Sequence, residues 1–197
     1  MEEIINPIEN EIKVVDDIFP NSYLSFLWEY AIKSRFVWGR TSSYMNNRYS
    51  GNSQRFTCNL TKQDLFNTGL IPYLQKITNE LSIQNLFLNR YYISHCSKST
   101  TSDSHVDYHD ANTITFLIYP NLEWDDMWAG DIKFYSENSA IDKSISVKPG
   151  RVIIFDSRIK HKVMPLSYFA EIDRFSFVIN ATLFPTQMES TIHITNA

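Results

Sequence analysis

Cysteine, glycine and histidine are scarce in this sequence of 197 residues, and long apolar runs are missing. Two cysteines, Cys58 and Cys96, are too few for a disulfide framework and have no metal-ligand spacing, so we expect ordinary free thiols. Five glycines and seven prolines exclude a collagen-like or low-complexity chain. No apolar run approaches the roughly 20 residues of a membrane helix, and the acidic residues 1–7 show no export signal. We therefore expect a cytoplasmic protein that does not bind a membrane.

Positive charge is also limited, because 18 Lys and Arg residues oppose 22 Asp and Glu residues and the net charge is −4. Because nucleic acid is a polyanion, a chain with net negative charge is less favoured to bind it. One stretch has the opposite character: no acidic residue lies between Tyr30 and Gln63, where cations alternate with aromatic rings. We expect residues 35–56 to form a basic aromatic loop that covers the site and selects an anionic or aromatic substrate. A solvated loop without function is the alternative.

Aromatic residues, 14% of the chain, and β-branched residues occur in short alternating runs, which are typical of strands. Two amphipathic helices are expected at 21–33, with Ile32 on the apolar face, and at 70–82. We predict one α+β, mainly β domain over 1–197, in which the helices cover one face of a two-layered antiparallel sheet. Its expected parts are the helices and the basic aromatic loop (1–84), a β core (85–184) and a C-terminal tail (185–197). The expected strands are 85–94, 112–119, 130–135, 143–147, 151–155 and 174–182.

One group of residues has metal-ligand character, and it is built on the few histidines. In an extended segment, His105 and Asp107 point to the same side and can take adjacent positions on one metal ion. A distant histidine on a neighbouring strand, His161, can supply the third ligand. Two histidines and one carboxylate are the ligand set of non-haem Fe(II) oxygenases, which keep other positions open. An accidental His-x-Asp pair is the competing interpretation, and His109 and Asp110 are interpreted as surface polar groups.

A second group lies in the last long strand, where charged or polar residues alternate with large apolar ones. Strand geometry sends Phe175 and Phe177 to one face and Arg174 with Ser176 to the other. An arginine that points into a barrel interior requires an anion, since burying it unpaired costs several kcal/mol. A guanidinium binds a carboxylate through two parallel hydrogen bonds. The sequence therefore predicts an anion beside Arg174.

Together these residues resemble the Fe(II)/2-oxoglutarate-dependent dioxygenases, and within them the prolyl 4-hydroxylase-like branch, which includes small phage and marine bacterial members. The resemblance implies a double-stranded β-helix, or jelly roll, in which His105, Asp107 and His161 hold iron. It also implies that Arg174, assisted by Ser176 and Tyr92, binds the cosubstrate 2-oxoglutarate. Oxygen would be the second cosubstrate and ascorbate a stimulant, in the cytoplasm of a bacterium or of a virus-infected cell. The resemblance rests on segments 90–92, 105–107, 113–119, 128–135, 148–156, 161–165 and 174–176.

The activity that this resemblance implies is hydroxylation of an unactivated C–H bond, with release of succinate and CO2. The substrate would be peptidyl, prolyl for example, or a small molecule. Halogenating relatives lack the carboxylate ligand, so Asp107 favours hydroxylation. The alternative is a cupin-like jelly roll that binds a metal and a small acid without turnover, or that acts as an isomerase.

Nearby aromatic residues and glycines have structural interpretations. We expect Trp124 and Trp128 to pack in the core or at its rim rather than to contact substrate. Gly130 and Gly150 are expected to be turn glycines without a direct part in the chemistry. The loop 166–173 is longer than in many relatives of the family.

Overall fold

The computed structural model describes residues 6–40, 54–100, 102–136, 141–184 and 192–194. Strands dominate this part of the chain, and within it no helix is long and apolar enough to cross a membrane. In chain order the elements are β1 (Ile12–Val15), α1 (Asn21–Lys33), β2 (Val37–Arg40), β3 (Gln54–Asn59), α2 (Lys62–Asn67), α3 (Ile71–Glu80), β4 (Leu86–Cys96), β5 (Thr113–Ile118), the 3-10 turn η1 (Asp126–Trp128), β6 (Ile132–Tyr135), β7 (Ile141–Ile145), β8 (Val152–Asp156), β9 (His161–Val163), β10 (Arg174–Leu183) and β11 (Ile192–Ile194).

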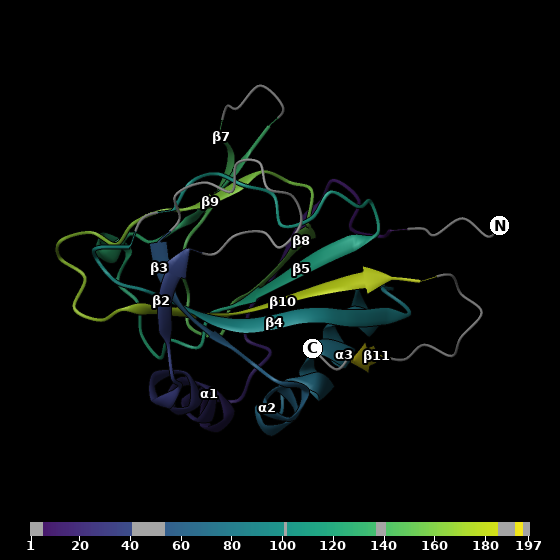
Figure 1. Ribbon diagram of the computed structural model, residues 1–197, viewed down its shortest axis with the longest axis horizontal. Coiled ribbons are helices and arrows are strands. Elements are labelled where there is room, and N and C mark those ends of the chain that lie inside the picture. The colour runs from purple at the N-terminus through teal and green to yellow at the C-terminus, as the bar shows by residue number, and fades with distance from the viewer. Residues whose placement is uncertain (1–5, 41–53, 101, 137–140, 185–191, 195–197) are drawn as a thin grey trace.

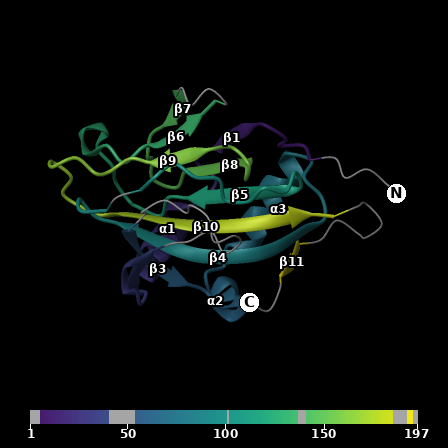
Figure 2. The same ribbon diagram turned by 45° about the horizontal axis from the view of Figure 1, so that its top comes forward.

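Two mainly antiparallel sheets form the two layers of the fold (Figure 1 and Figure 2). The larger sheet has the order β1-β8-β5-β10-β4-β3-β2, and β11 pairs with β4 in parallel. The smaller sheet has the order β7-β6-β9. In Figure 1 the three α-helices lie beneath the larger sheet, and the smaller sheet lies above it. This arrangement confirms the predicted jelly roll with helices against one face.

Two apolar cores follow from the alternation of side chains along β10. Phe175 and Phe177 point outward and pack with the helices. Val178 points inward and packs between the sheets with Phe155 of β8. Because alternate residues leave opposite faces of a strand, β10 supplies both cores. Arg174 lies on the inner face with Val178, as the sequence predicts.

The two predicted helices form close to their predicted bounds, with two departures from the expected pattern of helices. Pro72 lies in the first turn of α3, where its missing N–H breaks no helical bond. Ile32, however, is 45% exposed, because it lies about 100° around the helix from the buried Ala31. The short helix α2 is not predicted by the periodicity. It is fixed by Thr61 and Asp64, whose side chains accept hydrogen bonds from each other's backbone N–H.

The prediction of a loop over 35–56 is wrong at both ends. There β2 and β3 form an antiparallel pair at the edge of the larger sheet, next to β4. The physical reason is that β-branched and aromatic residues lie opposite each other: Val37 faces Thr57 and Trp38 faces Phe56. The covering role was assigned to the whole of 35–56, and its middle part, residues 41–53, lies outside the described residues.

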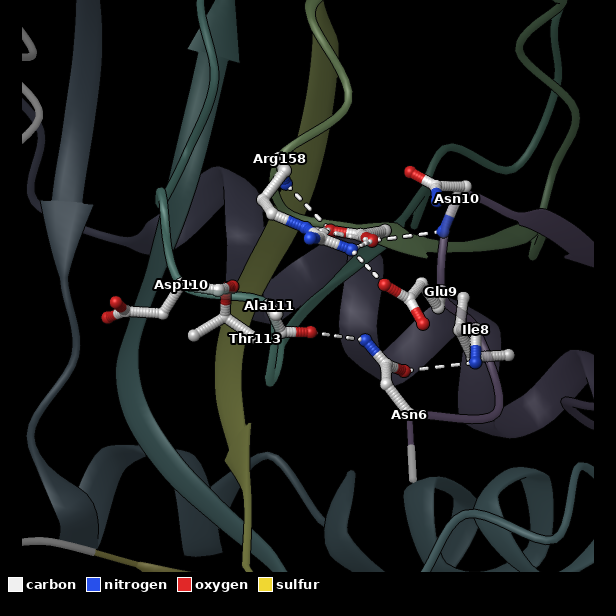
Figure 3. Close-up of polar contacts among 9 residues, drawn as sticks. Asn6, Ile8, Glu9, Asn10, Asp110, Ala111, Thr113 and Arg158 are labelled. Carbon is white, nitrogen blue, oxygen red and sulfur yellow. Dashed lines mark hydrogen bonds and ion pairs between the residues drawn. The ribbon is translucent and has the colours of Figure 1, made fainter. Parts of the chain in front are cut away.

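The segment before β1 is fastened to the loops beside the larger sheet (Figure 3). Asn6 donates from Nδ2 to the Ala111 carbonyl at 2.8 Å. Arg158 donates to the Asp156 carboxylate at 2.7 Å and to Glu9 at 3.1 Å. Asp156 is fully buried. Burial raises the pKa of its carboxyl, but Arg158 and two backbone N–H groups outweigh burial and hold this pKa below its usual value.

Replacing Asp156 with asparagine is expected to lower the free energy of unfolding by about 2 kcal/mol at neutral pH, because Arg158 loses a buried partner. Since the pKa is depressed in the folded protein, the carboxylate stabilises the fold above its unfolded pKa of about 3.8, and this stabilisation is lost as pH falls through the folded pKa. The difference from wild type in urea unfolding should therefore shrink below about pH 4. Glu9→Gln, at an exposed partner of the same arginine, is the control and should cost less than about 1 kcal/mol. A difference that does not change with pH would contradict this account.

Candidate metal centre and active site

Three metal-ligating side chains converge beside the smaller sheet. His105 and Asp107 lie between β4 and β5, and His161 is the first residue of β9. Their ligand atoms all lie within 4.8 Å of one another. Oδ1 of Asp107 is 3.7 Å from Nε2 of His105 and 3.9 Å from Nε2 of His161. All three line one pocket between the two sheets, so the structure brings together the residues predicted to bind a metal.

The backbone holds these ligands in place. The His105 N–H donates to the His161 carbonyl at 2.9 Å, and the His161 N–H donates to the His105 carbonyl at 2.8 Å. The loop that carries His105 therefore extends the smaller sheet beyond β9. The Asp107 N–H donates to the Ser157 carbonyl at 3.0 Å. Segments far apart in the sequence are thus joined at the ligands themselves.

Each histidine ring is oriented by a contact on its other nitrogen. Nδ1 of His105 lies 3.0 Å from the Asp103 carbonyl, and Nδ1 of His161 lies 3.0 Å from the Ile159 carbonyl. Because a carbonyl oxygen only accepts, both Nδ1 atoms are assigned the proton, and both Nε2 atoms keep a lone pair. A backbone carbonyl behind the ring is typical of metal-ligating histidines.

The Asp107 carboxylate is oriented in the same way. Its Oδ2 accepts from Thr115 Oγ1 at 2.8 Å and from Asn180 Nδ2 at 3.3 Å, while Oδ1 faces the histidines. Thr115 in turn accepts from Asn180 at 2.9 Å and bonds Ser157 at 2.8 Å. These supporting residues are not among those predicted from the sequence. The available signal was a polar residue between apolar neighbours in a strand: Thr115 follows Ile114 in β5, and Asn180 follows Ile179 in β10.

The protonation states suit a cation. Burial lowers the pKa of His105 to about 4, and His161 acts in the same direction. Burial raises the pKa of Asp107, but the two histidines and Thr115 hold it below its usual value. At neutral pH His105 is therefore neutral and Asp107 ionised, as metal binding requires. Two histidine nitrogens and one carboxylate oxygen fit Fe(II).

Thr115→Val is expected to weaken metal binding by roughly 10- to 100-fold, because it removes the hydroxyl that orients the Asp107 carboxylate. Titration of the metal-free protein with Mn(II), followed by electron paramagnetic resonance, measures this change. Thr113→Val is the matched control, since Thr113 lies on the same strand and donates to the Asp110 carbonyl instead. Equal affinities in the two variants would show that Thr115 does not support the site.

The other end of the pocket contains a buried cation. Arg174 is 1% exposed, and it donates from Nη1 to the Gly130 carbonyl and from Nη2 to Cys96 Sγ at 3.0 Å. Its guanidinium lies 5.8 Å from the centre of the Tyr119 ring. Among the described residues Arg174 pairs with no carboxylate, and its Nε and the Tyr119 hydroxyl are buried without a hydrogen-bond partner. Burial raises the pKa of Tyr119 to about 12, so both orphaned groups are donors. Such a pair fits a carboxylate.

Ser176 and Tyr92, the other residues predicted to bind 2-oxoglutarate, line the same pocket. Ser176 follows Arg174 on the same face of β10, and Tyr92 lies on β4 opposite Val178. Burial raises the pKa of Tyr92, so its hydroxyl stays protonated. The structure therefore places all six predicted site residues around one pocket.

Two residues without a predicted role hold Arg174. Gly130 has φ +84°, and a Cβ there would lie 2.8 Å from Leu166 Cδ2. Its carbonyl accepts from Arg174, so this glycine does more than form a turn. Cys96 is free, as predicted, but its sulfur also accepts from Arg174. Trp124 packs against the core between the sheets, as expected.

Comparison with known families identifies the class of this protein. The sequence model of the 2OG-Fe(II) oxygenase superfamily matches residues 86–182, about half of the chain, from β4 to β10. The matched range contains all six site residues, and the chain belongs to this superfamily. No curated protein matches the sequence significantly.

Solved structures share the fold at low identity. The prolyl-4-hydroxylase of Pseudomonas putida is 11% identical, with a TM-score of 0.61 over 88% of this chain and 93% of that chain. A prolyl hydroxylase from Trichoplax adhaerens, in complex with a hypoxia inducible factor oxygen degradation domain peptide fragment, is 15% identical, with a TM-score of 0.63 over 88% of this chain and 84% of that chain. The viral collagen prolyl hydroxylase of Paramecium bursaria chlorella virus-1 is 11% identical, with a TM-score of 0.61 over 87% of this chain and 96% of that chain.

The protein is thus a 2-oxoglutarate-dependent oxygenase with a prolyl 4-hydroxylase-like fold. Its metal is Fe(II), and its cosubstrates are 2-oxoglutarate and O2. The family match favours this enzyme over the cupin-like alternative.

Proposed function

We propose that this oxygenase is a hydroxylase in which His105, Asp107 and His161 hold Fe(II). The observation that carries the proposal is the convergence of Nε2 of His105, Oδ1 of Asp107 and Nε2 of His161 on one point. The second polar atom of each of these side chains already has a hydrogen-bond partner. This ligand set leaves other positions on the ion open. The carboxylate ligand also favours hydroxylation over halogenation.

Arg174 binds the distal carboxylate of 2-oxoglutarate in this proposal, assisted by Ser176 and Tyr92. When bound, Fe(II) and 2-oxoglutarate activate O2 for attack on a C–H bond, while 2-oxoglutarate becomes succinate and CO2. The contribution of the protein is position and environment. Gly130 and Cys96 fix the guanidinium before the cosubstrate enters, and apolar pocket residues such as Phe155 exclude water.

The substrate in this proposal is a peptide, prolyl for example, or a small molecule. The support is the fold shared with prolyl hydroxylases, one of which was solved with a peptide fragment.

A screen for succinate release tests the proposal. The protein is supplied with Fe(II), 2-oxoglutarate, ascorbate and air, and it is offered proline-containing peptides, free amino acids and nucleotides. Each peptide is paired with a copy in which alanine replaces proline. For a hydroxylase, we expect that the substrate stimulates succinate release. The product should be heavier than the substrate by about 16 mass units, the mass of one oxygen atom. Stimulated succinate without oxygen in the product would contradict hydroxylation, and no 2-oxoglutarate consumption under any condition would contradict the site assignment.

A further inference from the structure

A second arginine shares the pocket with the proposed iron ligands. Arg55 lies on β3, is 6% exposed and lines the pocket together with His105, Asp107 and Arg174. The mechanism proposed above does not use it. In the sequence, Arg55 belongs to the basic aromatic stretch and has no predicted role of its own.

The register of the larger sheet explains how Arg55 reaches the pocket. Phe56, His95 and Phe175 lie opposite one another on β3, β4 and β10, and their rings stack on the outer face. Because side chains alternate along a strand, the neighbouring residues point to the inner face. Arg55 is therefore on the same side of the sheet as Arg174.

Arg55 has no counter-charge within the described part of the chain. It forms no ion pair there, and its Nε is buried without a hydrogen-bond partner. The sequence between Tyr30 and Gln63 contains no acidic residue, so residues 41–53 supply no carboxylate either. A buried guanidinium without a counter-charge, and with an unsatisfied Nε, is costly for the fold, and such a residue is kept where an anionic ligand completes it.

The charges in the pocket indicate what that ligand is, and this step rests on the proposed function. Among the described residues that line the pocket, Asp107 is the one acidic residue, against the cations Arg55 and Arg174. Fe(II) adds two positive charges, and 2-oxoglutarate adds two negative charges. One positive charge remains, although both carboxylates of 2-oxoglutarate already have partners in the metal and Arg174. The loaded pocket therefore keeps one unbalanced positive charge, which one more anion would neutralise.

We propose that Arg55 binds a carboxylate of the substrate and so selects carboxylate-bearing substrates. A guanidinium matches a carboxylate through two parallel hydrogen bonds, which fixes the orientation of the bound molecule as well as its charge. This carboxylate belongs either to a free amino acid or small acid, or to an acidic side chain of a peptide.

Binding experiments without turnover test this role. Wild type, Arg55→Met and Arg55→Lys are loaded anaerobically with Fe(II) and 2-oxoglutarate, and the visible charge-transfer band reports cosubstrate binding. Calorimetry with redox-inert Mn(II) then compares free amino acids with their amides, and end-blocked peptides containing Glu or Asp with their Gln or Asn copies. Arg35→Met is the matched control, because Arg35 is exposed and lies outside the pocket.

Wild type and Arg35→Met are expected to bind one acidic probe at least 10-fold more tightly than its neutral copy. Arg55→Met should lose this preference and keep the 2-oxoglutarate band, and Arg55→Lys should fall between them. The melting temperature of Arg55→Met should not fall, since the substitution removes an unpaired buried charge; a structural arginine would lower it.

Several results would overturn the role of Arg55. These are equal affinities of wild type for the acidic and neutral probes, binding of neither probe, or a preference retained in Arg55→Met. Loss of the band in Arg55→Met alone would assign Arg55 to 2-oxoglutarate instead of substrate. A wild-type protein without the band would contradict the proposed function itself, which the same spectra detect separately.

Discussion

Alanine in place of His105, Asp107 or His161 is expected to abolish 2-oxoglutarate consumption while the fold persists. Losing a residue that partners a metal ligand lowers metal affinity or activity by roughly 10- to 100-fold, and losing the ligand itself should lower them further. The fold should persist because the bonds that join His105 to His161 are backbone bonds and do not depend on either ring. Succinate release, Mn(II) titration and circular dichroism together measure activity, metal binding and folding.

His109→Ala is the matched control for these three variants. His109 is exposed and lies two residues from Asp107, so it shares the segment without sharing the pocket. Its removal should leave metal binding and turnover unchanged. If His109→Ala loses the metal and His105→Ala does not, the assignment of the ligands is wrong.

Arg174→Ala is expected to raise the concentration of 2-oxoglutarate needed for half-saturation by about 100-fold or more. Charge-assisted hydrogen bonds in a desolvated pocket contribute a few kcal/mol, and each 1.4 kcal/mol is about a factor of 10. Arg174→Lys should be intermediate, because an ammonium group keeps the charge but lacks the planar fork that can bond Gly130 and a carboxylate together. Anaerobic titration of the Fe(II) protein with 2-oxoglutarate measures the effect apart from turnover.

An unchanged requirement for 2-oxoglutarate in Arg174→Ala would move the anchor to another cation. Arg151 and Arg158 are the alternatives nearest in the sequence, but Asp16 holds Arg151 through two hydrogen bonds and Asp156 holds Arg158. Among the described residues, Arg55 is then the remaining arginine that lines the pocket. The variants of these two pocket arginines therefore distinguish the cosubstrate site from the substrate site.

The sequence predicts the long elements because their pattern is local. The alternation in β10 separates Phe175 from Arg174 without any knowledge of the partner strands. The short strands β1, β9 and β11 contain three or four residues, too few for a periodic pattern, and they are defined by the strands beside them. The edge strands β2 and β3 flank a polar, turn-forming segment, so composition favoured a loop.

The same division holds within the site. His105 and Asp107 are predicted because the spacing of two residues on one segment determines their direction. The support for Asp107 depends on register across the sheet, where Asn180 lies opposite Thr115. The position of Arg55 depends on the pairing of β3 with β4. Contacts of this kind join distant parts of the chain, and a single sequence does not contain the register.

The backbone pairing of His105 with His161 has a consequence for metal supply. Backbone hydrogen bonds join the ligand segments and involve none of the ligand atoms, so we expect that loading requires no folding step and that one divalent ion can replace another in the folded protein. A site of nitrogen and oxygen ligands binds Cu(II), and generally Zn(II), more tightly than Fe(II). The metal found in the purified protein will therefore reflect which ions were abundant during its production. The supply of metal ions in the cell that makes the protein, and not the rigidity of the site, therefore determines whether iron is bound.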